Sequence, residues 1–411
     1  MVAVGKPRGT RDFPPGEMER RRAVEKKMRD VFERYGYREI ATPTMEHMEL
    51  FTMKSGDAVI DETYSFNDKS GRMLALRPEL TAPTMRMYME QMKMSPKPLK
   101  VYYFGNCFRY DRPQKGRYRE FWQMGCELIG ANTPEAVAEM VSTAYSVLEQ
   151  AGLDDVKLRI GDLDILRSFI GRMGVEDAGG IMRLIDKSDH DGVREMLGGA
   201  AGADEFMKFL ECGDFEALGE FFDEGETERL GKVLEWLSVF GTPYILDTSI
   251  ARGLDYYRGI VFEIDAPSLG AEKQLCGGGE YSLLPLLGGD DTPTAGFALG
   301  FDRIMLALEK EGHDFASPKM RVYIHPIGDG MRKEAAKLAS RLRGGGVVVD
   351  MDLMRRSVQK SLQYADRIGA KKAIIMGPDE WARGMVTLKN METGEQKEVG
   401  TEDVENALGL I

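Results

Sequence analysis

The chain has 411 residues, of which 43% are hydrophobic and 9% aromatic, and its formal net charge is −12. One hydrophobic core rarely serves a chain of this length, so we expect two or three domains. The sequence has no apolar run near the ~20 residues that cross a bilayer, and no apolar leader at its N-terminus. It therefore predicts a cytoplasmic protein without a membrane partner.

The distribution of cysteines and charges limits the classes of protein to which the chain can belong. The four cysteines are widely spaced without a CxxC pair, and there are only four histidines, which argues against a disulfide framework and a structural zinc site. Residues 161–240 hold 19 acidic and 8 basic side chains, a balance of −11 that leaves −1 for the rest of the chain. A basic surface elsewhere therefore remains compatible with a nucleic-acid partner.

The N-terminal half predicts one long helix and a basic hairpin. Residues 17–35 carry one apolar stripe on a charged segment, which is typical of an amphipathic helix. Residues 101–107 and 121–130 are expected to be strands joined by the basic loop FRYDRPQKGRYRE. In the return strand, Gln123, Gly125 and Glu127 alternate with apolar residues and form a polar face. Gln123 and Glu127 would lie roughly 13 Å apart along the strand, and we expect Gly125 to leave room for a ligand.

Farther along the chain, residues 161–240 predict an acidic, mostly helical insertion. CGGGEY at 276–281 predicts a flexible turn, residues 294–310 a glycine-rich strand that leads into a helix, and residues 311–320 a linker. After the linker, strands alternate with helices, which predicts a parallel α/β domain. Its second helix and flanks are basic, which indicates either a solvated face or a nucleic-acid surface.

Four arginines suggest a common ligand. Arg109 and Arg117 flank the hairpin, Arg303 begins a helix after a glycine-rich strand, and Arg252 opens the tyrosine-rich stretch RGLDYYRGIVFE. Arginine is favoured where oxyanions are held in fixed geometry, because its planar fork donates two hydrogen bonds at once. Several such groups on one antiparallel sheet would suit a triphosphate. The alternative is a set of separate surface salt bridges. The chain has neither a GxxxxGK[ST] loop nor a strand–GxGxxG–helix unit.

Specific motifs resemble a known family over nearly the whole chain. GYREIATPTMEHMELF, FRYDRPQKGRYREFWQMGCELIG and GFALGFDRIMLALE resemble the three motifs of class II aminoacyl-tRNA synthetases. RGLDYYRGIVFE and LRPELTAP resemble the signatures of the histidyl-tRNA synthetases. The resemblance implies a multidomain α/β protein with an antiparallel β-sheet flanked by helices, a helical insertion and a C-terminal parallel or mixed α/β anticodon-binding domain. The implied boundaries are 1–160 and 241–315 for the catalytic domain, 161–240 for the insertion, and 321–411 for the anticodon-binding domain.

The resemblance also implies an activity. The family activates L-histidine with ATP to histidyl-adenylate and pyrophosphate, then transfers histidine to the 3′ end of its tRNA. Magnesium would bridge the outer phosphates, no protein side chain is assigned as a metal ligand, and a homodimer is expected from the first motif. Arg109 and Arg252 would be catalytic, bridging the histidine carboxylate and the α-phosphate from two sides.

The remaining roles carried over from the family are as follows. The predicted histidine-binding residues are Glu79, Thr81, Arg109, Gln123, Glu127, Arg252, Tyr256 and Tyr257. The predicted ATP-binding residues are Arg109, Arg117 and Arg303. The predicted tRNA-binding residues are Arg112, Gln114, Arg119, Arg355 and Arg356.

The chain departs from the family pattern at three positions near these motifs: Asp111, Arg258 and Glu280.

Three other functions remain as alternatives to the ligase activity. A synthetase-like regulatory subunit of ATP phosphoribosyltransferase would usually lack the C-terminal domain and the catalytic arginines, which this chain has. A class II synthetase for another amino acid would lack RGLDYY with Gln123 and Glu127. A tRNA- or nucleotide-binding protein without turnover would not need the full set of arginines.

Overall fold

The structure is a computed structural model that describes residues 4–110, 117–175, 177–251, 256–315 and 321–409. The chain divides into two compact units, residues 1–315 and 316–411. Each unit has its own hydrophobic core. The expected linker at 311–320 spans the division.

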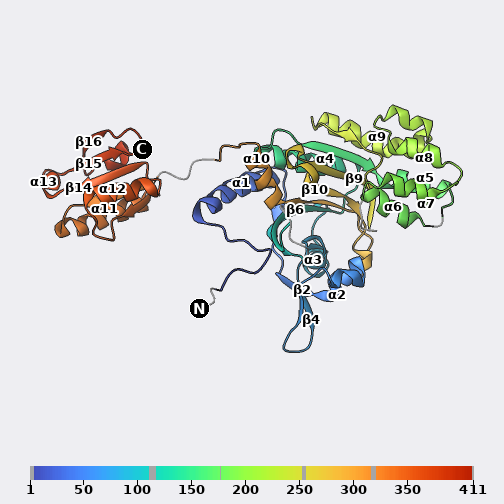
Figure 1. The fold of residues 1–411 in the computed structure, drawn as a ribbon, viewed down its shortest axis with the longest axis horizontal. Helices are drawn as coiled ribbons and strands as arrows, with labels where there is room; N and C mark the ends of the chain where they lie inside the picture. Colours follow the sequence, from blue (N-terminus) through green and yellow to red (C-terminus); the bar gives the residue numbers. More distant parts are fainter. Residues whose placement is uncertain (1–3, 111–116, 176, 252–255, 316–320, 410–411) are drawn as a thin grey trace. The chain divides into compact units, whose positions relative to one another are not determined.

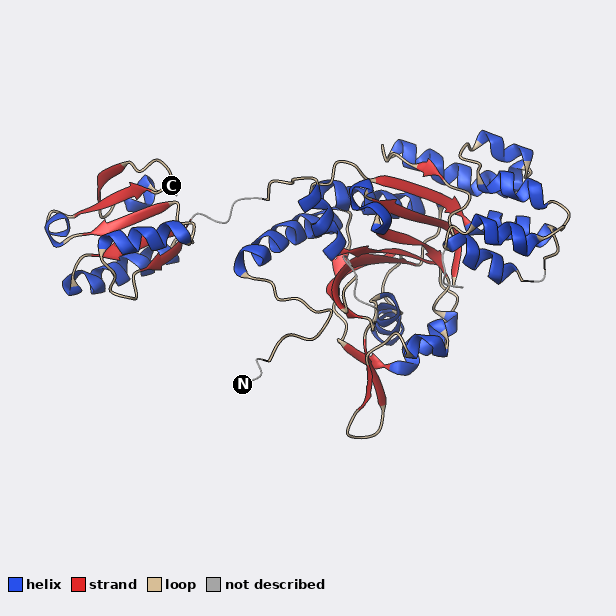
Figure 2. Ribbon diagram, viewed as in Figure 1, coloured by secondary structure: helices blue, strands red, loops and turns tan. Residues whose placement is uncertain are grey.

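An eight-stranded, mainly antiparallel sheet organises the first unit (Figure 2). Only its two edge strands pair in parallel with their neighbours. In spatial order the strands are β1 (Arg38–Glu39), β5 (Leu99–Phe108), β6 (Glu120–Ile129), β11 (Thr294–Gly300), β10 (Gln274–Tyr281), β9 (Tyr257–Asp265), β7 (Lys157–Asp162) and β8 (Ile245–Leu246). The predicted hairpin is the β5–β6 pair, whose register runs from Leu99 opposite Ile129 to Phe108 opposite Glu120.

Helices cover both faces of this sheet (Figure 1). On one face lie α1 (Pro15–Arg34) and α4 (Pro134–Ala151), and α4 contacts β9, β10 and β11. The other side carries α2 (Met48–Ser55), α3 (Thr81–Met87) and a small sheet of β2 (Met45–His47), β4 (Met73–Leu76) and β3 (Ser65–Asn67). Helix α10 (Phe301–Lys310) follows β11 directly. The short helices of this unit are η1 (Asp57–Ile60), η2 (Tyr88–Met92), η4 (Pro267–Glu272) and η5 (Pro285–Leu287).

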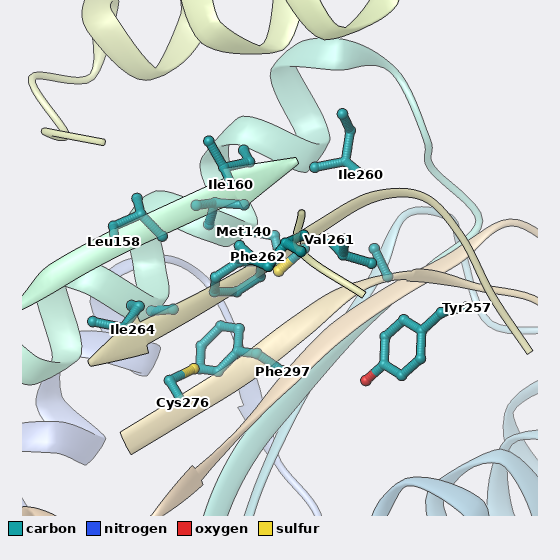
Figure 3. Packing of buried hydrophobic residues seen from close by; sticks show 14 of the residues in the cluster. Met140, Leu158, Ile160, Tyr257, Ile260, Val261, Phe262, Ile264, Cys276 and Phe297 are labelled. Atoms are coloured by element: carbon teal, nitrogen blue, oxygen red, sulfur yellow. The ribbon is translucent and has the colours of Figure 1, made fainter. Parts of the chain in front are cut away.

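The apolar stripe of the first helix packs as its periodicity predicts. Val24, Met28 and Phe32 are each at most 1% exposed, and the Phe32 ring stacks on Tyr102 with centroids 5.0 Å apart. On the sheet, Phe297 of β11 meets Phe262 of β9, with ring centroids 6.2 Å apart (Figure 3). Phe297 also meets Phe32 of α1, with ring centroids 5.8 Å apart. This core holds the central strands at fixed separation and so fixes the surface that bears the candidate site.

The acidic segment forms a helical layer beside the sheet. Its elements are α5 (Leu163–Arg172), α6 (Ala178–Asp186), α7 (His190–Leu197), α8 (Ala203–Leu210), η3 (Glu216–Glu220) and α9 (Glu224–Val239). A phenylalanine cluster forms its centre, with Phe169 stacked on Phe209 at 5.2 Å. Helix α9 begins with a capping box between Asp223 and Glu226, which satisfies backbone N–H groups that a helix start leaves open.

The second unit is a mixed α/β domain. Its sheet order is β13 (Val348–Met351), β12 (Arg321–Pro326), β14 (Lys372–Met376), β15 (Met385–Asn390), β16 (Gln396–Gly400). The first three strands are parallel, as the alternation of strands and helices predicted, and the last two pairings are antiparallel. The helices are η6 (Asp329–Met331), α11 (Arg332–Gly344), α12 (Val358–Arg367), α13 (Pro378–Ala382) and α14 (Val404–Ala407).

One secondary-structure prediction is wrong. CGGGEY at 276–281 is not a turn but most of β10, which pairs with β9 and β11. Its glycines permit close approach of the neighbouring strands: a Cβ on Gly278 would lie 2.5 Å from the Gly296 carbonyl oxygen. All four cysteines are free thiols, and no helix among the described residues is long and apolar enough to cross a membrane.

Candidate active site

An arginine-rich cavity of about 330 Å³ lies against β6, β10 and the start of α10. Its lining includes Arg109, Arg117 and Arg303, three of the four arginines that the sequence grouped together. Gln123 of β6 and Gly277 of β10 contribute to the same wall. Three permanent cations around one cavity repel one another, so the arrangement favours an anionic ligand with several charges.

Glu272 forms ion pairs with two of these arginines. The Arg303 Nη2 atom lies 2.7 Å from Glu272 Oε2, and the Arg117 Nε atom lies 3.4 Å from the same oxygen. Arg303 also donates from Nη1 to the Gln274 carbonyl at 2.9 Å. Burial lowers the pKa of Arg303, Glu272 opposes this shift, and the charges of Arg117 and Arg109 add to it. An entering polyanion would therefore compete with Glu272 for guanidinium groups that are already positioned.

Arg109 stands just beyond the end of β5. Its Nε donates to the Pro78 carbonyl at 3.0 Å, and its guanidinium carbon lies 5.1 Å from the centroid of the Phe121 ring. Pro78 immediately precedes Glu79, so this hydrogen bond joins the cavity to the LRPELTAP segment. Arg109 is thereby held in one orientation between the two.

A second part of the site surrounds Glu127, farther along β6. Its side chain is 1% exposed and accepts hydrogen bonds from Tyr103, at 3.0 Å, and from the hydroxyl of Tyr281. Burial raises the pKa of Glu127 to about 8, although the hydroxyl donors pull it the other way. Gly296 is opposite Glu127 on β11, and a Cβ there would lie 1.9 Å from Glu127 Oε2, so only glycine admits this carboxyl.

Tyrosine rings form a wall beside Glu127. Tyr256 and Tyr257 stack with centroids 5.0 Å apart, and Tyr281 meets them edge-on at 5.9 and 6.1 Å. Tyr257 stands apart from the Phe262–Phe297 packing in Figure 3. A carboxyl with tyrosine hydroxyls and ring faces suits a flat ligand with ring N–H groups.

Glu79 and Thr81 lie at the start of α3. Glu79 accepts the Thr81 backbone N–H at 2.6 Å and pairs with Lys54 of α2 at 3.2 Å. The Lys54 side chain is only 7% exposed, and its ammonium lies 5.1 Å from the centroid of the Tyr256 ring. The Thr81 hydroxyl lies 3.4 Å from that of Tyr103. Glu79, Thr81 and Glu127 are therefore linked through Tyr103.

The expected role of Gly125 is wrong. A Cβ at this position would lie 2.8 Å from the Tyr103 hydroxyl and 2.3 Å from the Phe297 carbonyl oxygen. The space above Gly125 thus holds the Tyr103 side chain, which donates to Glu127, rather than a ligand. The glycine contributes to the site by admitting that tyrosine.

Arg252, Arg112 and Gln114 lie outside the described residues. Arg119 packs its guanidinium 4.3 Å from the centroid of the Tyr110 ring. In the second unit, Arg355 is exposed, whereas Arg356 contacts buried Asp352 at 3.2 Å and lies 4.2 Å from the Tyr364 ring centroid.

Two departures from the family pattern face each other on neighbouring strands. Arg258 of β9 is opposite Glu280 of β10. Glu280 forms an ion pair with Arg229 of α9 and accepts the Ile260 backbone N–H at 3.0 Å. Burial raises the pKa of Glu280, and Arg229 opposes that shift. Glu280 thus ties the acidic helical segment to the strand that carries Tyr281.

Comparison with known proteins agrees with this geometry. Residues 9–304 match the sequence model of the histidyl-tRNA synthetase family, and residues 321–409 match that of an anticodon-binding domain. The chain belongs to the histidyl-tRNA synthetase family. It is 46% identical to the histidine–tRNA ligase of Archaeoglobus fulgidus over 98% of this chain and 99% of that protein.

Solved structures show the same fold for this histidyl-tRNA synthetase family member. Apo histidyl-tRNA synthetase from S. aureus has a TM-score of 0.80 and 31% identity, covering 98% of this chain and 99% of that one. A Bacillus halodurans chain described as an ATP phosphoribosyltransferase regulatory subunit/histidyl-tRNA synthetase has a TM-score of 0.78 and 25% identity, covering 92% of this chain and 99% of that one. The predicted fold class is therefore confirmed.

Sequence reasoning missed Tyr103, Tyr281 and Lys54. All three act on predicted residues, since the tyrosines donate to Glu127 and Lys54 pairs with Glu79. Tyr281 was detectable only as a buried aromatic after the glycine run. Nothing local to Lys54 indicates its partner, 25 residues away in the sequence.

Proposed function

We infer that the chain is a histidine–tRNA ligase that forms histidyl-adenylate from L-histidine and ATP and passes histidine to the 3′ end of its tRNA. Its family membership supports this activity. The observation that supports the residue roles is the continuity along β6, where Gln123 lines the arginine cavity and Glu127 lies beside the tyrosine rings. We propose that ATP occupies the first and the histidine side chain the second.

The chemistry explains why cations lie at this junction. Adenylate formation brings the histidine carboxylate against the α-phosphate of ATP, and these two anions repel each other. We propose that Arg109 bridges them from one side and that Arg252 approaches the phosphate from the other, where each stabilises charge that develops in the transition state. Arg117 and Arg303 would take the outer phosphates in exchange for Glu272. Holding both substrates in line supplies much of the rate.

Recognition of histidine would divide between two groups of residues. We propose that Glu127 and Tyr257 bind the imidazole nitrogens, with Tyr256 beside them, and that Glu79, Thr81 and Gln123 hold the α-amino group. An amino acid without matching donors and acceptors would remove water from these buried polar groups without replacing its hydrogen bonds, which penalises binding of that amino acid. The residues around Glu127 therefore favour histidine by their chemistry.

We propose that magnesium takes most of its ligands from the substrate. Among the described residues there is no group of three His, Cys, Asp or Glu side chains placed to hold a metal ion. Glu272 forms ion pairs with both Arg117 and Arg303. Magnesium prefers phosphate oxygens and water as ligands, so we propose that it enters with ATP.

The proposal extends to tRNA, oligomeric state and compartment. Arg112, Gln114 and Arg119 would approach the acceptor end, and the region of Arg355 and Arg356 would approach the anticodon stem-loop. A homodimer is part of the proposal, because Met45, Phe66 and Met73 expose 42–52% of their surface on the small β2–β4–β3 sheet, whose strand β2 belongs to the first motif. Four free thiols suit a reducing cytoplasm.

The test is exchange of labelled pyrophosphate into ATP, dependent on each amino acid in turn. We expect exchange with histidine alone, reduced by orders of magnitude in Arg252→Ala and retained in Arg194→Ala, a matched arginine on α7 away from the cavity. Purified wild-type protein that binds histidine without exchange would instead indicate the regulatory subunit of ATP phosphoribosyltransferase. Exchange with another amino acid would reassign the substrate.

A further inference from the structure

The segment Gly9–Phe13 lies along the return arm of the basic hairpin. The Arg119 backbone N–H donates to the Gly9 carbonyl at 2.9 Å, and the aliphatic stem of Arg119 lies where a Gly9 side chain would be. Two residues on, the Arg11 guanidinium carbon lies 3.5 Å from the centroid of the Tyr118 ring. The N-terminal segment is thereby attached to residues 118 and 119, beside Arg117.

The same arginine reaches the start of α10. Arg11 forms an ion pair with Asp302, whose side chain is 4% exposed and also accepts the Trp122 backbone N–H at 2.8 Å. Tyr118 and Asp302 both line the arginine cavity. Each directly adjoins an arginine proposed to bind ATP, since Tyr118 follows Arg117 and Asp302 precedes Arg303 in the sequence.

Neutralising Asp302 does not by itself require Arg11. Arg21 of α1 contacts Asp302 at 2.9 Å, is itself 3% exposed, and packs its guanidinium against Phe13 and Phe301. Arg11 differs from Arg21 in that its guanidinium also stacks on the Tyr118 ring, which lines the cavity next to Arg117. The Arg11 Nε is buried without a hydrogen-bond partner, so holding this side chain in place has a cost that the other contacts must offset.

We propose that Arg11 is a positioning residue for ATP, which fixes the separation of Arg117 and Arg303 across the cavity. This inference rests on the proposed function. Arg11 does not line the cavity and acts through the ring of Tyr118 and the carboxylate of Asp302. A planar guanidinium can stack on a ring and pair with a carboxylate at the same time, which lysine cannot reproduce.

The test separates the Michaelis constants of the two small substrates in histidine-dependent pyrophosphate exchange. Arg11→Met should raise the KM for ATP about tenfold while the KM for histidine changes little, and Arg11→Lys should fall between Arg11→Met and wild type. Arg20→Met is the control, because Arg20 is a nearby exposed arginine whose guanidinium lies over Phe315, 5.5 Å from its centroid. Its two constants should match those of wild type.

A double-mutant cycle decides between positioning and a general structural role. Tyr118→Leu should raise the KM for ATP, and Arg11→Met should add little in the Tyr118→Leu background. Equal increases in both Michaelis constants, additive effects, or an unchanged KM for ATP in Arg11→Met would overturn the proposal. Failure of the wild type to exchange with histidine would instead refute the proposed function, and calorimetric titration of ATP into Arg11→Met would still test Arg11.

Discussion

The buried carboxyl of Glu127 should make stability depend on pH. Its pKa rises from 4.5 to about 8 in the folded protein, first because of burial. The folded state thus binds a proton more tightly than the unfolded state, and this contribution to stability is complete below pH 4.5 and is lost as pH rises towards 8. Replacing Glu127 with glutamine keeps the shape and removes the titration.

The size of the effect follows from the shift. With these two pKa values, the unfolding free energy of Glu127→Gln relative to wild type should increase by about 3 kcal/mol between pH 4.5 and 7, and by about 4 kcal/mol up to pH 8. The glutamine amide can still accept from Tyr103 at one oxygen. The absolute difference at pH 5 includes altered hydrogen bonds, whereas its change with pH reports the carboxyl.

Urea unfolding followed by circular dichroism, at pH 5, 6, 7 and 8, measures this difference. Glu220→Gln, at an exposed carboxylate of the helical segment, is the matched control and should give a nearly constant difference from wild type. A Glu127→Gln difference that stays flat from pH 5 to pH 8 would refute the reasoning. It would mean that Tyr103 and Tyr281 stabilise the carboxylate enough to cancel its desolvation.

Three further predictions concern the other charged parts of the molecule. Arg303→Ala should raise the KM for ATP in pyrophosphate exchange more than Arg117→Ala does, because the Arg303 side chain is 19% exposed and the Arg117 side chain is 52% exposed. The reverse ranking would contradict the proposed phosphate contacts. Glu280→Arg should lower the melting temperature by placing a second guanidinium against Arg229, and adding Arg229→Glu should restore part of the loss. A double variant without any recovery would argue against the Arg229–Glu280 ion pair. Removal of residues 321–411 should leave exchange active but raise the KM for tRNA about tenfold or more, and an unchanged KM for tRNA would eliminate the anticodon role.

Local patterns in the sequence were enough to predict most of the helices and strands. The stripe on residues 17–35 became α1, and the expected strand at 121–130 became most of β6. These inferences succeed because the 3.6- and 2-residue periods depend on neighbours along the chain. The glycine run of β10 was misread as a turn. Its glycines are required because Phe297 and Gly296 of the neighbouring strand pack closely against them, and the local sequence does not indicate that contact.

The sequence by itself determined which residue types are present for oxyanion and imidazole binding, and its motifs pointed to the family. Tertiary structure decided which of them meet. Tyr281 donates to Glu127 across 154 positions of sequence, and Arg11 reaches Asp302 across 291. Such pairs are set by sheet order and helix packing, and burial then sets the protonation of Glu127. Desolvation is a property of everything packed around a group, so it emerges only once the chain is folded.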